Sequence, residues 1–443
     1  MKTIHVNRAT KIVKKGEAPP YQQVKADICV VGAGIAGVSA AIEAARLGHK
    51  VVLLDGLPNL GGNAANGAMG LFCGFFSHGV VPFQLTYGVA SEILRDLGAA
   101  GRLYLKPPIA VYDEVALLRW IENKVREAGI TVILNSYIHR VNVSGRRITS
   151  IEFTSRYGSV VVEADGFIDA SGDAAVAWNA GLPCRESDVG MLYGSQLMYL
   201  TNVHIHRGDD QAKLEAETSK CLEEKAPQYG LMRKSGFLSF PVVMEEGVAF
   251  VNMTHIETPL DPLGASTKIM EGKDQADRVV ELLKNEFPKE FGDAVVQKYG
   301  LLGIRQTRWI MGSRQLTVDD ICAGTRFPDA VARSSWPIEL HDHPGGYVWE
   351  VFPGDHVHYI PYGSMTPPDM DNLLAVGRCI DGDVAALSSV RVMGPCIATG
   401  KAAANALDIA GKGSVHDISI EELENRLSDN LNRADHIDQA AKP

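Results

Sequence analysis

A short glycine-rich stretch near the start of the chain constrains the fold more than any other feature. Residues 32–37 read GAGIAG, which is the spacing G-x-G-x-x-G. They follow an apolar run at 27–31 whose β-branched residues predict a buried strand. An alanine-rich segment at 38–47 predicts a helix, and the apolar run at 51–54 predicts a second strand. The segment is therefore expected to form a βαβ unit of a parallel sheet.

The three glycines each satisfy a steric requirement of a dinucleotide site. Gly32 permits the tight turn, Gly34 lets a pyrophosphate approach the backbone, and Gly37 lets the helix pack against the strand. The start of the helix supplies free N–H groups and the positive end of a helix dipole. Asp55 ends the second strand, where a carboxylate hydrogen-bonds a ribose 2′-OH and repels a 2′-phosphate. This pattern predicts NAD or FAD rather than NADP.

Later segments carry related signals. A second glycine pair at 61–62 lies where the chain would pass the pyrophosphate, and 168–173 ends a strand in a turn of small residues. Residues 372–378 end another strand, and 391–395 introduce an alanine-rich helix near the C-terminus. Dinucleotide-type signals therefore lie at both ends of the chain, while the pattern across 190–340 is less regular.

Composition argues against several other classes of protein. The 443 residues are 46% hydrophobic and 22% charged, which is typical of a globular chain and excludes a disordered one. The net charge of −10 argues against a general nucleic-acid or anionic-membrane binder. The seven cysteines form no C-x-x-C pair, which argues against a disulfide framework or a zinc ribbon. With no apolar leader and no stretch of roughly 18 apolar residues, we expect a cytoplasmic protein without a membrane span.

Three longer segments carry a resemblance to a known family. DASGD at 169–173 is similar to a family segment DATGD. NLLAVGRCID at 372–381 and RVMGPCIATGKAAA at 391–404 are similar to NLLVAGRCIS…RVM…C…TGQAAG. GIRQTRWIMGSRQLTVDDI at 303–321 is similar to a block R-x-x-R…G…LT-x-x-D. The chain resembles the bacterial FAD-dependent oxidoreductases of the glutathione-reductase-like superfamily across most of 25–412. It departs from them at Lys401, where the family often has Gln, and at Asp381, where it often has Ser.

The resemblance implies a set of contacts along a non-covalently bound FAD. They are Gly32, Gly34, Ile35, Ala36 and Gly37 with the pyrophosphate; Asp55 with the adenosine ribose; Gly62 and Asn63 along the phosphate and ribityl path; Ile138 with adenine; Ser171, Gly172 and Asp173 at the adenosine end; Gly377 and Arg378 with the pyrophosphate or ribityl chain; and Arg391 and Gly394 at the last helix. That helix would point its N-terminus at the flavin N1–C2=O, where reduced flavin is anionic. No residue is marked for covalent attachment.

The implied fold class is α/β. It consists of a Rossmann-like FAD-binding domain, a parallel sheet with helices, interrupted by an inserted α+β substrate domain. The predicted divisions are an N-terminal arm at 1–24, FAD-binding parts at 25–190 and 346–412, a substrate domain at 191–345, and a polar, helix-compatible tail at 413–443.

The stretch 303–362 is dense in side chains that could face a substrate. Arg305 and Arg308 could clamp a carboxylate, with surface or interdomain ion pairs as the alternative. The candidate proton acceptors are His341, His343, His356 and His358, each of which could instead be a satisfied structural histidine. The two H-x-H pairs, and a third at His204 and His206, could present imidazoles to a metal. No further ligand lies at a recognisable spacing, so no metal is expected.

These residues predict an enzyme that transfers hydride between flavin N5 and a small polar metabolite, at a C–OH or C–N carbon. Electrons would pass to oxygen, a quinone or a carrier protein, because the chain has one dinucleotide fingerprint and no redox cysteine pair. One alternative is a fumarate-reductase-like reductase of an activated alkene, and another is a non-redox flavoprotein. The sequence leaves the substrate and the oligomeric state open.

Overall fold

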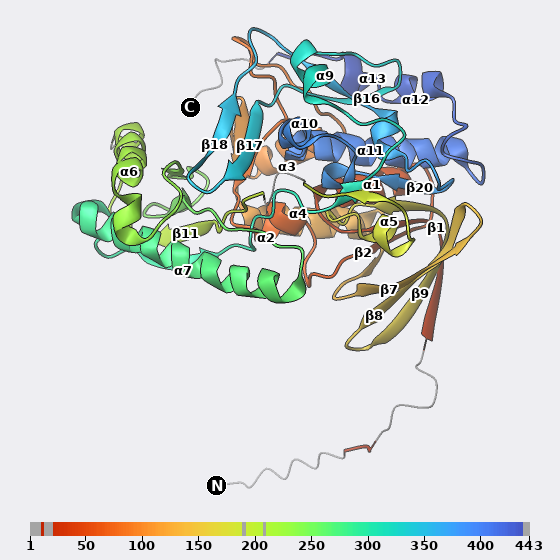
Figure 1. Cartoon of the computed structure of the whole chain (residues 1–443), viewed down its shortest axis with the longest axis horizontal. Helices are drawn as coiled ribbons and strands as arrows, with labels where there is room; N and C mark the ends of the chain where they lie inside the picture. Colours follow the sequence, from red (N-terminus) through yellow and green to blue (C-terminus); the bar gives the residue numbers. More distant parts are fainter. Residues whose placement is uncertain (1–9, 13–20, 188–191, 207–209, 437–443) are drawn as a thin grey trace.

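The computed structural model describes residues 10–12, 21–187, 192–206 and 210–436, which form a larger and a smaller lobe (Figure 1). The larger lobe is built on a seven-stranded sheet in the order β6-β2-β1-β9-β8-β7, with β20 also paired to β9. The smaller lobe has a four-stranded sheet in the order β12-β13-β11-β14. No helix in these ranges is both long and apolar enough to cross a membrane.

The large sheet is parallel at its centre. Its parallel strands are β6 (Thr131–Ile133), β2 (Val51–Leu54), β1 (Tyr21–Val31), β9 (Gly158–Asp169) and β20 (Leu373–Ala375), and the antiparallel strands β8 (Arg147–Ser155) and β7 (Tyr137–Ser144) extend it. Ile28–Val31 and the whole of β2 are buried, as expected for strands covered on both faces. The predicted strand–turn–helix–strand unit is thus confirmed, with α1 (Ile35–Arg46) as its helix.

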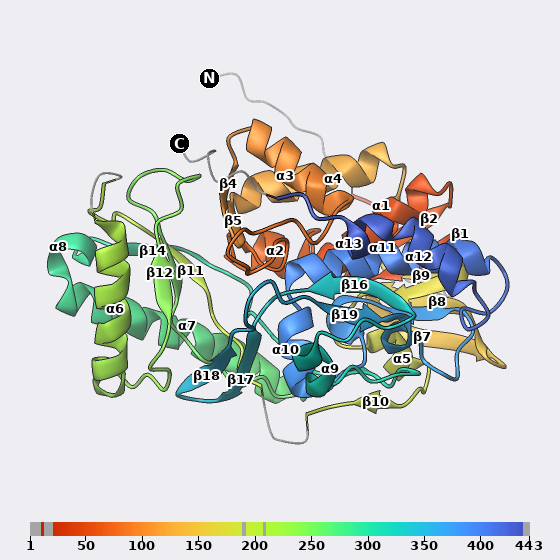
Figure 2. The same ribbon diagram turned by 90° about the horizontal axis from the view of Figure 1, so that it is seen from above.

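Two helices from opposite ends of the chain pack together over this sheet. α11 (Met393–Ala410) lies alongside α1, and the Ser39 hydroxyl donates to the carbonyl oxygen of Ile397 at 2.8 Å. A Cβ on Gly400 would lie 2.3 Å from the Ala36 carbonyl oxygen, so only glycine allows this close approach. The two halves of the nucleotide domain therefore form one core, and Figure 2 shows the ribbons of α1 and α11 next to each other.

The smaller lobe has its own hydrophobic core. Its strands are β11 (Met198–Thr201), β12 (Phe237–Ser239), β13 (Ala249–Asn252) and β14 (Val295–Tyr299), and its helices are α6 (Gln211–Lys225), α7 (Pro262–Glu286) and α8 (Pro288–Phe291). The Asp210 and Asp261 side chains accept backbone N–H bonds at the starts of α6 and α7. The members of this core run from Met198 to Ala294.

A β-hairpin lies between the two lobes in both views (Figures 1 and 2). Its strands are β17 (Ile338–His343) and β18 (Gly346–Glu350), and Ile338 pairs with Glu350. The predicted division between 345 and 346 therefore falls inside a hairpin. In addition, β16 (Ala330–Ser334) pairs with β19 (His358–Pro361) and is buried in the core of the larger lobe. The predicted substrate domain at 191–345 is thus too long, because an apolar strand does not reveal which core it joins.

Both predicted terminal segments also need correction. β1 begins at Tyr21, which pairs with Ser159, so 21–24 belong to the sheet and not to an arm; the arm's residues 1–9 and 13–20 lie outside the described ranges. The tail forms α12 (Ile420–Arg426) and α13 (Ser428–Asn432), as its helix-compatible pattern predicts. Its leucines are nevertheless buried in the core of the larger lobe.

The remaining elements connect or cover these sheets. They are α2 (Gly62–Asn66), β3 (Leu71–Phe72), α3 (Val89–Ala99), β4 (Leu103–Lys106), β5 (Ile109–Tyr112), α4 (Glu114–Glu127), α5 (Ala175–Asn179), β10 (Cys184–Arg185), β15 (Trp309–Ile310), α9 (Val318–Ala323), α10 (Val384–Val390) and the 3₁₀ turns at Ala226–Tyr229, Tyr362–Met365 and Gly377–Cys379.

Candidate active site

The glycine turn after β1 has no room for side chains at two of its three glycines. Gly32 has a φ of +103°, and a Cβ there would lie 2.3 Å from the Ala170 carbonyl oxygen. A Cβ on Gly37 would lie 1.8 Å from the Gly32 carbonyl oxygen. The turn is therefore pressed against β9 on one side and against α1 on the other.

The third glycine faces open space. Gly34 has an ordinary φ of −65°, and a Cβ there would meet nothing within 4 Å. It is the N-cap of α1 and offers no side-chain cap, so the first turn of the helix at Ile35 and Ala36 is open to an anion. The second glycine pair lies against this turn, with the Gly61 N–H donating to Ala33 O at 2.7 Å and a Cβ on Gly62 only 2.9 Å from Gly34 Cα. These residues fit a pyrophosphate.

Asp55 ends β2 beside this turn. Its carboxylate accepts the Ala33 N–H at 2.5 Å and the Leu57 N–H at 2.8 Å. Burial raises the pKa of Asp55, although these backbone N–H bonds oppose the shift. The Tyr137 ring packs against Gly56, and Ile138 is the next residue on β7. Asn63 follows Gly62 in the first turn of α2.

Two further predicted segments meet at the end of β9. Gly172 has a φ of +80°, and a Cβ there would lie 2.3 Å from a guanidinium nitrogen of Arg378. That guanidinium also lies 3.8 Å from an Asp173 carboxylate oxygen. The sequence did not indicate the role of Asp169, whose buried carboxylate accepts the Ser171 hydroxyl at 2.6 Å and the Val176 N–H at 2.8 Å. Asp169 therefore holds this turn in place.

The start of α11 connects the nucleotide turn to a second group of polar residues. A Cβ on Gly377 would lie 3.1 Å from Ala36 Cβ and 3.5 Å from Cys396 Sγ. The Cys396 thiol in turn donates to the Arg391 carbonyl oxygen at 3.2 Å. Burial raises the pKa of Cys396 to about 12, so it is a packed thiol. The start of α11 thus lies between the fingerprint and Arg391.

The N-terminus of α11 also packs on the 73–74 loop. The Gly394 N–H donates to the Cys73 carbonyl oxygen at 3.0 Å, and a Cβ on Gly394 would lie 1.9 Å from Gly74 O. Pro395, the next residue, has no N–H to offer. Gly394 is therefore required for this close contact, and its own N–H is already used.

Three arginines gather beside this helix start, and we call them the arginine cluster: Arg233, Arg305 and Arg391. They come from the segment before β12, the segment before β15 and the segment before α11. Burial is the main cause that lowers the pKa of Arg233 and Arg391 to about 9 and that of Arg305 to about 10. The charge of Arg305 contributes to the shifts of the other two, and Glu339 opposes all three.

Glu339 also ends a chain of hydrogen bonds that we call the relay: His255, His341 and Glu339. His255 Nδ1 lies 3.1 Å from the Pro344 carbonyl oxygen, and His255 Nε2 lies 2.8 Å from His341 Nδ1. His341 Nε2 lies 3.0 Å from Glu339 Oε1. The other oxygen of Glu339 accepts the Trp336 indole N–H at 3.0 Å.

The relay can take up one proton. The Pro344 carbonyl only accepts, so His255 Nδ1 carries hydrogen. Each of the three contacts in the relay needs one proton to be a hydrogen bond. Two neutral imidazoles supply only two, because each carries a single ring N–H. Burial and the nearby arginines lower the pKa of His341 and His255, so both imidazoles are neutral at pH 7. The contact between His341 Nε2 and Glu339 Oε1 is therefore the one that gains its proton when the relay takes one up. Glu339 is the member of the relay that solvent reaches, because its side chain is 26% exposed and both imidazoles are buried.

The relay and the arginine cluster lie where the two lobes and the hairpin meet. Arg233 and His255 come from the smaller lobe, and Glu339 and His341 from β17. The Lys234 N–H donates to the Gly345 carbonyl oxygen at 2.9 Å, which ties the smaller lobe to the hairpin turn. Junctions between domains are where ligand sites are most often found.

The other predicted catalytic side chains lie apart from this site. Arg308 pairs with Glu186 at 2.9 Å and stacks 3.8 Å over the Trp178 ring, as in the ion-pair alternative. His343 is exposed beside Asp342, because a register irregularity between Leu340 and His343 turns it away from His341.

The second histidine pair has structural partners. His356 Nε2 donates to the Ile321 carbonyl oxygen at 2.8 Å, and its ring stacks on Phe352 at 4.2 Å. His358 is buried with Nε2 2.9 Å from the Ser389 hydroxyl. Within the described ranges, no group of three or more His, Cys, Asp or Glu side chains is arranged to hold a metal.

Four residues of this site were not predicted from the sequence: Arg233, His255, Glu339 and Tyr347. The Tyr347 ring stacks on His341 with a centroid distance of 4.6 Å, and Arg233 lies 5.5 Å from the same ring. Glu339 could have been found, because residues two apart on a strand share one face and His341 was a candidate. Arg233 and His255 reach the site only through the fold of the smaller lobe.

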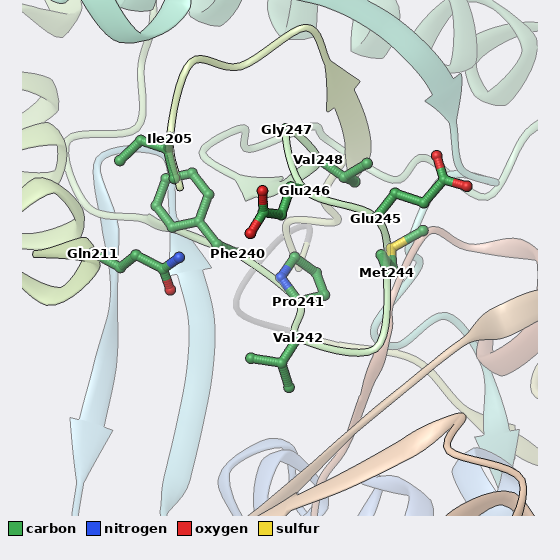
Figure 3. A pocket seen from close by; sticks show the side chains of 10 residues that line it. All are labelled: Ile205, Gln211, Phe240, Pro241, Val242, Met244, Glu245, Glu246, Gly247 and Val248. Carbon is green, nitrogen blue, oxygen red and sulfur yellow. The ribbon is translucent and has the colours of Figure 1, made fainter. Parts of the chain in front are cut away.

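Two hollows adjoin the smaller lobe. The one in Figure 3 has a volume of about 20 Å³, enough for about one water. None of its ten lining residues belongs to the relay or to the arginine cluster. The other, of about 380 Å³, is open and is lined by Tyr347, His343, Lys234 and Ser235, among others. It shares Tyr347 with the site.

Comparison with known proteins identifies a family and several partial relatives. The family described as FAD dependent oxidoreductase matches residues 27–427. The chain is 30% identical over 167 residues to digeranylgeranylglycerophospholipid reductase 2 of Methanothermobacter thermautotrophicus, covering 36% of this chain and 43% of that protein. It is 46% identical over 57 residues to the probable oxidoreductase OrdL of Haemophilus influenzae, covering 11% and 13%. The match thus spans less than half the length of these two relatives. A thiamine thiazole synthase of Saccharolobus islandicus is 26% identical over 244 residues, covering 51% and 87%.

Solved structures resemble the chain over most of its length at low identity. A geranylgeranyl bacteriochlorophyll reductase-like protein from Thermoplasma acidophilum aligns over 91% of this chain and 82% of that one, with 13% identity and a TM-score of 0.48. The flavin-dependent brominase Bmp2 aligns over 92% and 83%, with 13% identity and a TM-score of 0.48.

Proposed function

Because the chain belongs to the family of FAD-dependent oxidoreductases, we propose that it transfers hydride between FAD and a small polar metabolite. The reacting carbon of the metabolite carries a hydroxyl or amino group. The proton that accompanies the hydride is exchanged with the relay. An external acceptor, which is oxygen, a quinone or a carrier protein, then removes the electrons.

The residues of the glycine turn would hold the FAD. The first turn of α1 would bind its pyrophosphate over the open face of Gly34, and Asp55 would bind the adenosine ribose. Bound FAD supplies a hydride acceptor or donor at its N5 atom. No residue in this region is singled out for covalent attachment, so the cofactor is expected to dissociate on denaturation.

One observation carries the proposal: a continuous series of contacts links the nucleotide turn to the relay through the start of α11. Ala36, Gly377 and Cys396 are in contact, and Cys396 hydrogen-bonds the Arg391 backbone. The Arg391 guanidinium donates to the Glu339 carbonyl oxygen at 3.0 Å. Glu339 of the relay is therefore one hydrogen bond away from Arg391, at the start of α11.

The relay is suited to act as a base during oxidation of an alcohol or amine. Its His341–Glu339 contact lacks one proton when both imidazoles are neutral, so it can accept the proton of the reacting hydroxyl or amino group. His255 and the Pro344 carbonyl fix the tautomer of His341. The carbonyl accepts from His255 Nδ1, so His255 Nε2 must accept from His341 Nδ1. Arg305, held by the Tyr193 carbonyl oxygen at 2.8 Å, would orient the metabolite.

Single-turnover reduction of the FAD-loaded protein tests this role. His341→Gln is expected to slow reduction of the flavin by the substrate about a hundredfold, the usual contribution of a general base. His139→Gln changes an exposed histidine on β7 and serves as the control. Equal rates in wild type and His341→Gln, at equal FAD content, would rule out the relay as the base.

A second function, reduction of an activated alkene, has one observation in its favour. Among the described residues, the Arg391 Nη1 atom is buried without a hydrogen-bond partner, so it could clamp a carboxylate of an unsaturated acid. In that reaction hydride and one proton add across the double bond. Reoxidation of dithionite-reduced protein by unsaturated dicarboxylic acids would favour this reading, and inertness would dismiss it.

A further inference from the structure

The arginine cluster carries more positive charge than its surroundings balance. In the described part of the chain, none of Arg233, Arg305 and Arg391 has a carboxylate within 4.0 Å of its guanidinium. The acid whose charge acts on all three is Glu339. Three cations and one carboxylate leave a net charge of about +2 at the junction of the two lobes.

The hydrogen bonds of the cluster are also incomplete. Arg233 is 2% exposed, and its Nη1 donates only to neutral acceptors: Asn252 Oδ1 at 2.8 Å, the Thr254 carbonyl oxygen at 3.0 Å and Ser195 Oγ at 3.3 Å. The Arg233 Nε and the Arg391 Nη1 are both buried, and neither has a hydrogen-bond partner among the described residues. Unpaired buried donors of this kind cost stability unless a ligand accepts from them.

A guanidinium group does not relieve burial by losing its proton, so an anion is the remaining way to balance it. We propose that the arginine cluster binds the two carboxylates of a small dicarboxylate substrate; this names the substrate class of the proposed oxidoreductase and rests on that function. The planar fork of an arginine matches a carboxylate, and three arginines on separate segments suit two separated carboxylates better than one compact anion.

The open hollow beside the cluster provides access. It has a volume of about 380 Å³ and shares Tyr347 with the cluster, where the ring lies over Arg233 and stacks on His341. Lys234 and Glu223 both line it, so the charges of its own lining balance. A volume of this size suits a small metabolite, and the charge of the arginine cluster would attract an anion.

Titration of the FAD-loaded protein with succinate tests the site without requiring turnover. The readouts are perturbation of the flavin spectrum and a rise in the melting temperature. We expect saturable binding of succinate, weaker binding of acetate, and no binding of butane-1,4-diol, which has the same chain length without charge. Raising the ionic strength should weaken succinate binding.

Variants locate the binding. Arg233→Met and Arg305→Met should weaken succinate binding by about tenfold or more, because each leaves a carboxylate without its partner. Arg305→Lys, which keeps the charge and loses the fork, should lie between. Arg119→Met removes an exposed arginine on α4 and should change nothing.

Other outcomes overturn the proposal. Unchanged succinate affinity in both methionine variants, or equal binding of butane-1,4-diol, would show that the cluster does not bind carboxylates. Equal affinity for inorganic phosphate would assign it to a compact anion. Loss of FAD from the variants, with no succinate response in wild type, would assign the cluster to the cofactor. Reduction of the flavin by neutral alcohols without succinate binding would refute this inference alone, whereas succinate binding by a protein whose flavin no metabolite reduces would refute the proposed function.

Discussion

His341 Nδ1 lies 2.8 Å from His255 Nε2, although His341 belongs to the β17–β18 hairpin and His255 to the smaller lobe. The bond fixes the tautomer of His341, because His255 gives its only ring hydrogen to the Pro344 carbonyl and its Nε2 must therefore accept from His341 Nδ1. The free nitrogen of His341 is therefore aimed at Glu339 with no proton of its own. The hydrogen bond between the hairpin and the smaller lobe thus leaves His341 Nε2 as the nitrogen that can accept a proton.

Glu339→Gln should leave the relay unable to accept a proton. The glutamine amide can donate to His341 Nε2, so the hydrogen bonds remain while the capacity to accept a proton is lost. We expect flavin reduction by the substrate to slow about a hundredfold or more. Succinate should bind more tightly, because the negative charge opposing the arginines is gone. Rapid-mixing kinetics and titration measure the two effects.

The control for this variant is Glu217→Gln, an exposed glutamate on α6 that pairs with Lys213. It should leave both the rate and the affinity unchanged. A wild-type reduction rate in Glu339→Gln would contradict the assignment of the relay.

Two of the three fingerprint glycines should respond differently to substitution by alanine: Gly34→Ala should affect FAD binding, and Gly37→Ala should affect stability. Gly34→Ala places a methyl group in open space, so unfolding of the FAD-free protein should change by less than about 1 kcal/mol, while FAD affinity falls. Gly37→Ala drives a methyl group into the Gly32 carbonyl, 1.8 Å away, and should destabilise the fold by about 3 kcal/mol or more. Denaturant unfolding and FAD titration separate the two. Unchanged FAD binding in Gly34→Ala would contradict the proposed pyrophosphate position.

His358 should make the protein less stable in mild acid. Burial lowers its pKa to about 3, whereas the unfolded chain binds a proton near pH 6.5. Between these values the unfolded state binds more protons, so stability falls as pH falls below about 6.5, by about 1.4 kcal/mol per pH unit for this group. His358→Gln should reduce that slope by one proton, measured by denaturant unfolding from pH 7 to pH 5. An unaltered slope would mean that His358 is protonated in the folded state.

The C-terminal helices should be essential for stability. Leu431 is 1% exposed in the core of the larger lobe. Leu431→Ala should therefore destabilise the protein by about 2 to 5 kcal/mol, because it removes buried contacts and leaves a cavity. Leu263→Ala changes an exposed leucine on α7 and should have little effect. Equal melting temperatures for wild type and Leu431→Ala would contradict this packing.

The parts of the fold predicted correctly are those set by local sequence. The glycine spacing at 32–37, the apolar runs of β1 and β2, and the alanine-rich α11 each act within a few residues, so their pattern alone predicts them. The buried side of α12 and α13 had a local signal as well. Leu423, Leu427 and Leu431 recur every four residues, a helical spacing that the polar composition of the tail obscured.

The parts that could not be predicted depend on distant contacts. Arg233 and His255 join the site because the smaller lobe packs against the β17–β18 hairpin. The spacing of residues along the chain does not predict that contact. His343 was predicted beside His341, but an irregularity in the hairpin turns it outward. The predicted division at 345/346 was misplaced because β16 pairs with β19, which lies beyond that division. The periodicity of apolar residues predicts a strand but not its partner.

The visible absorption spectrum of the purified protein, recorded anaerobically during addition of hydroxy acids, amino acids, alcohols and sugars, tests the central claim most directly. We expect flavin bands that bleach with a hydroxylated or aminated dicarboxylate and stay bleached until oxygen or a quinone is admitted. A protein that binds no FAD after reconstitution, or whose flavin no metabolite reduces and no alkene reoxidises, would contradict the account.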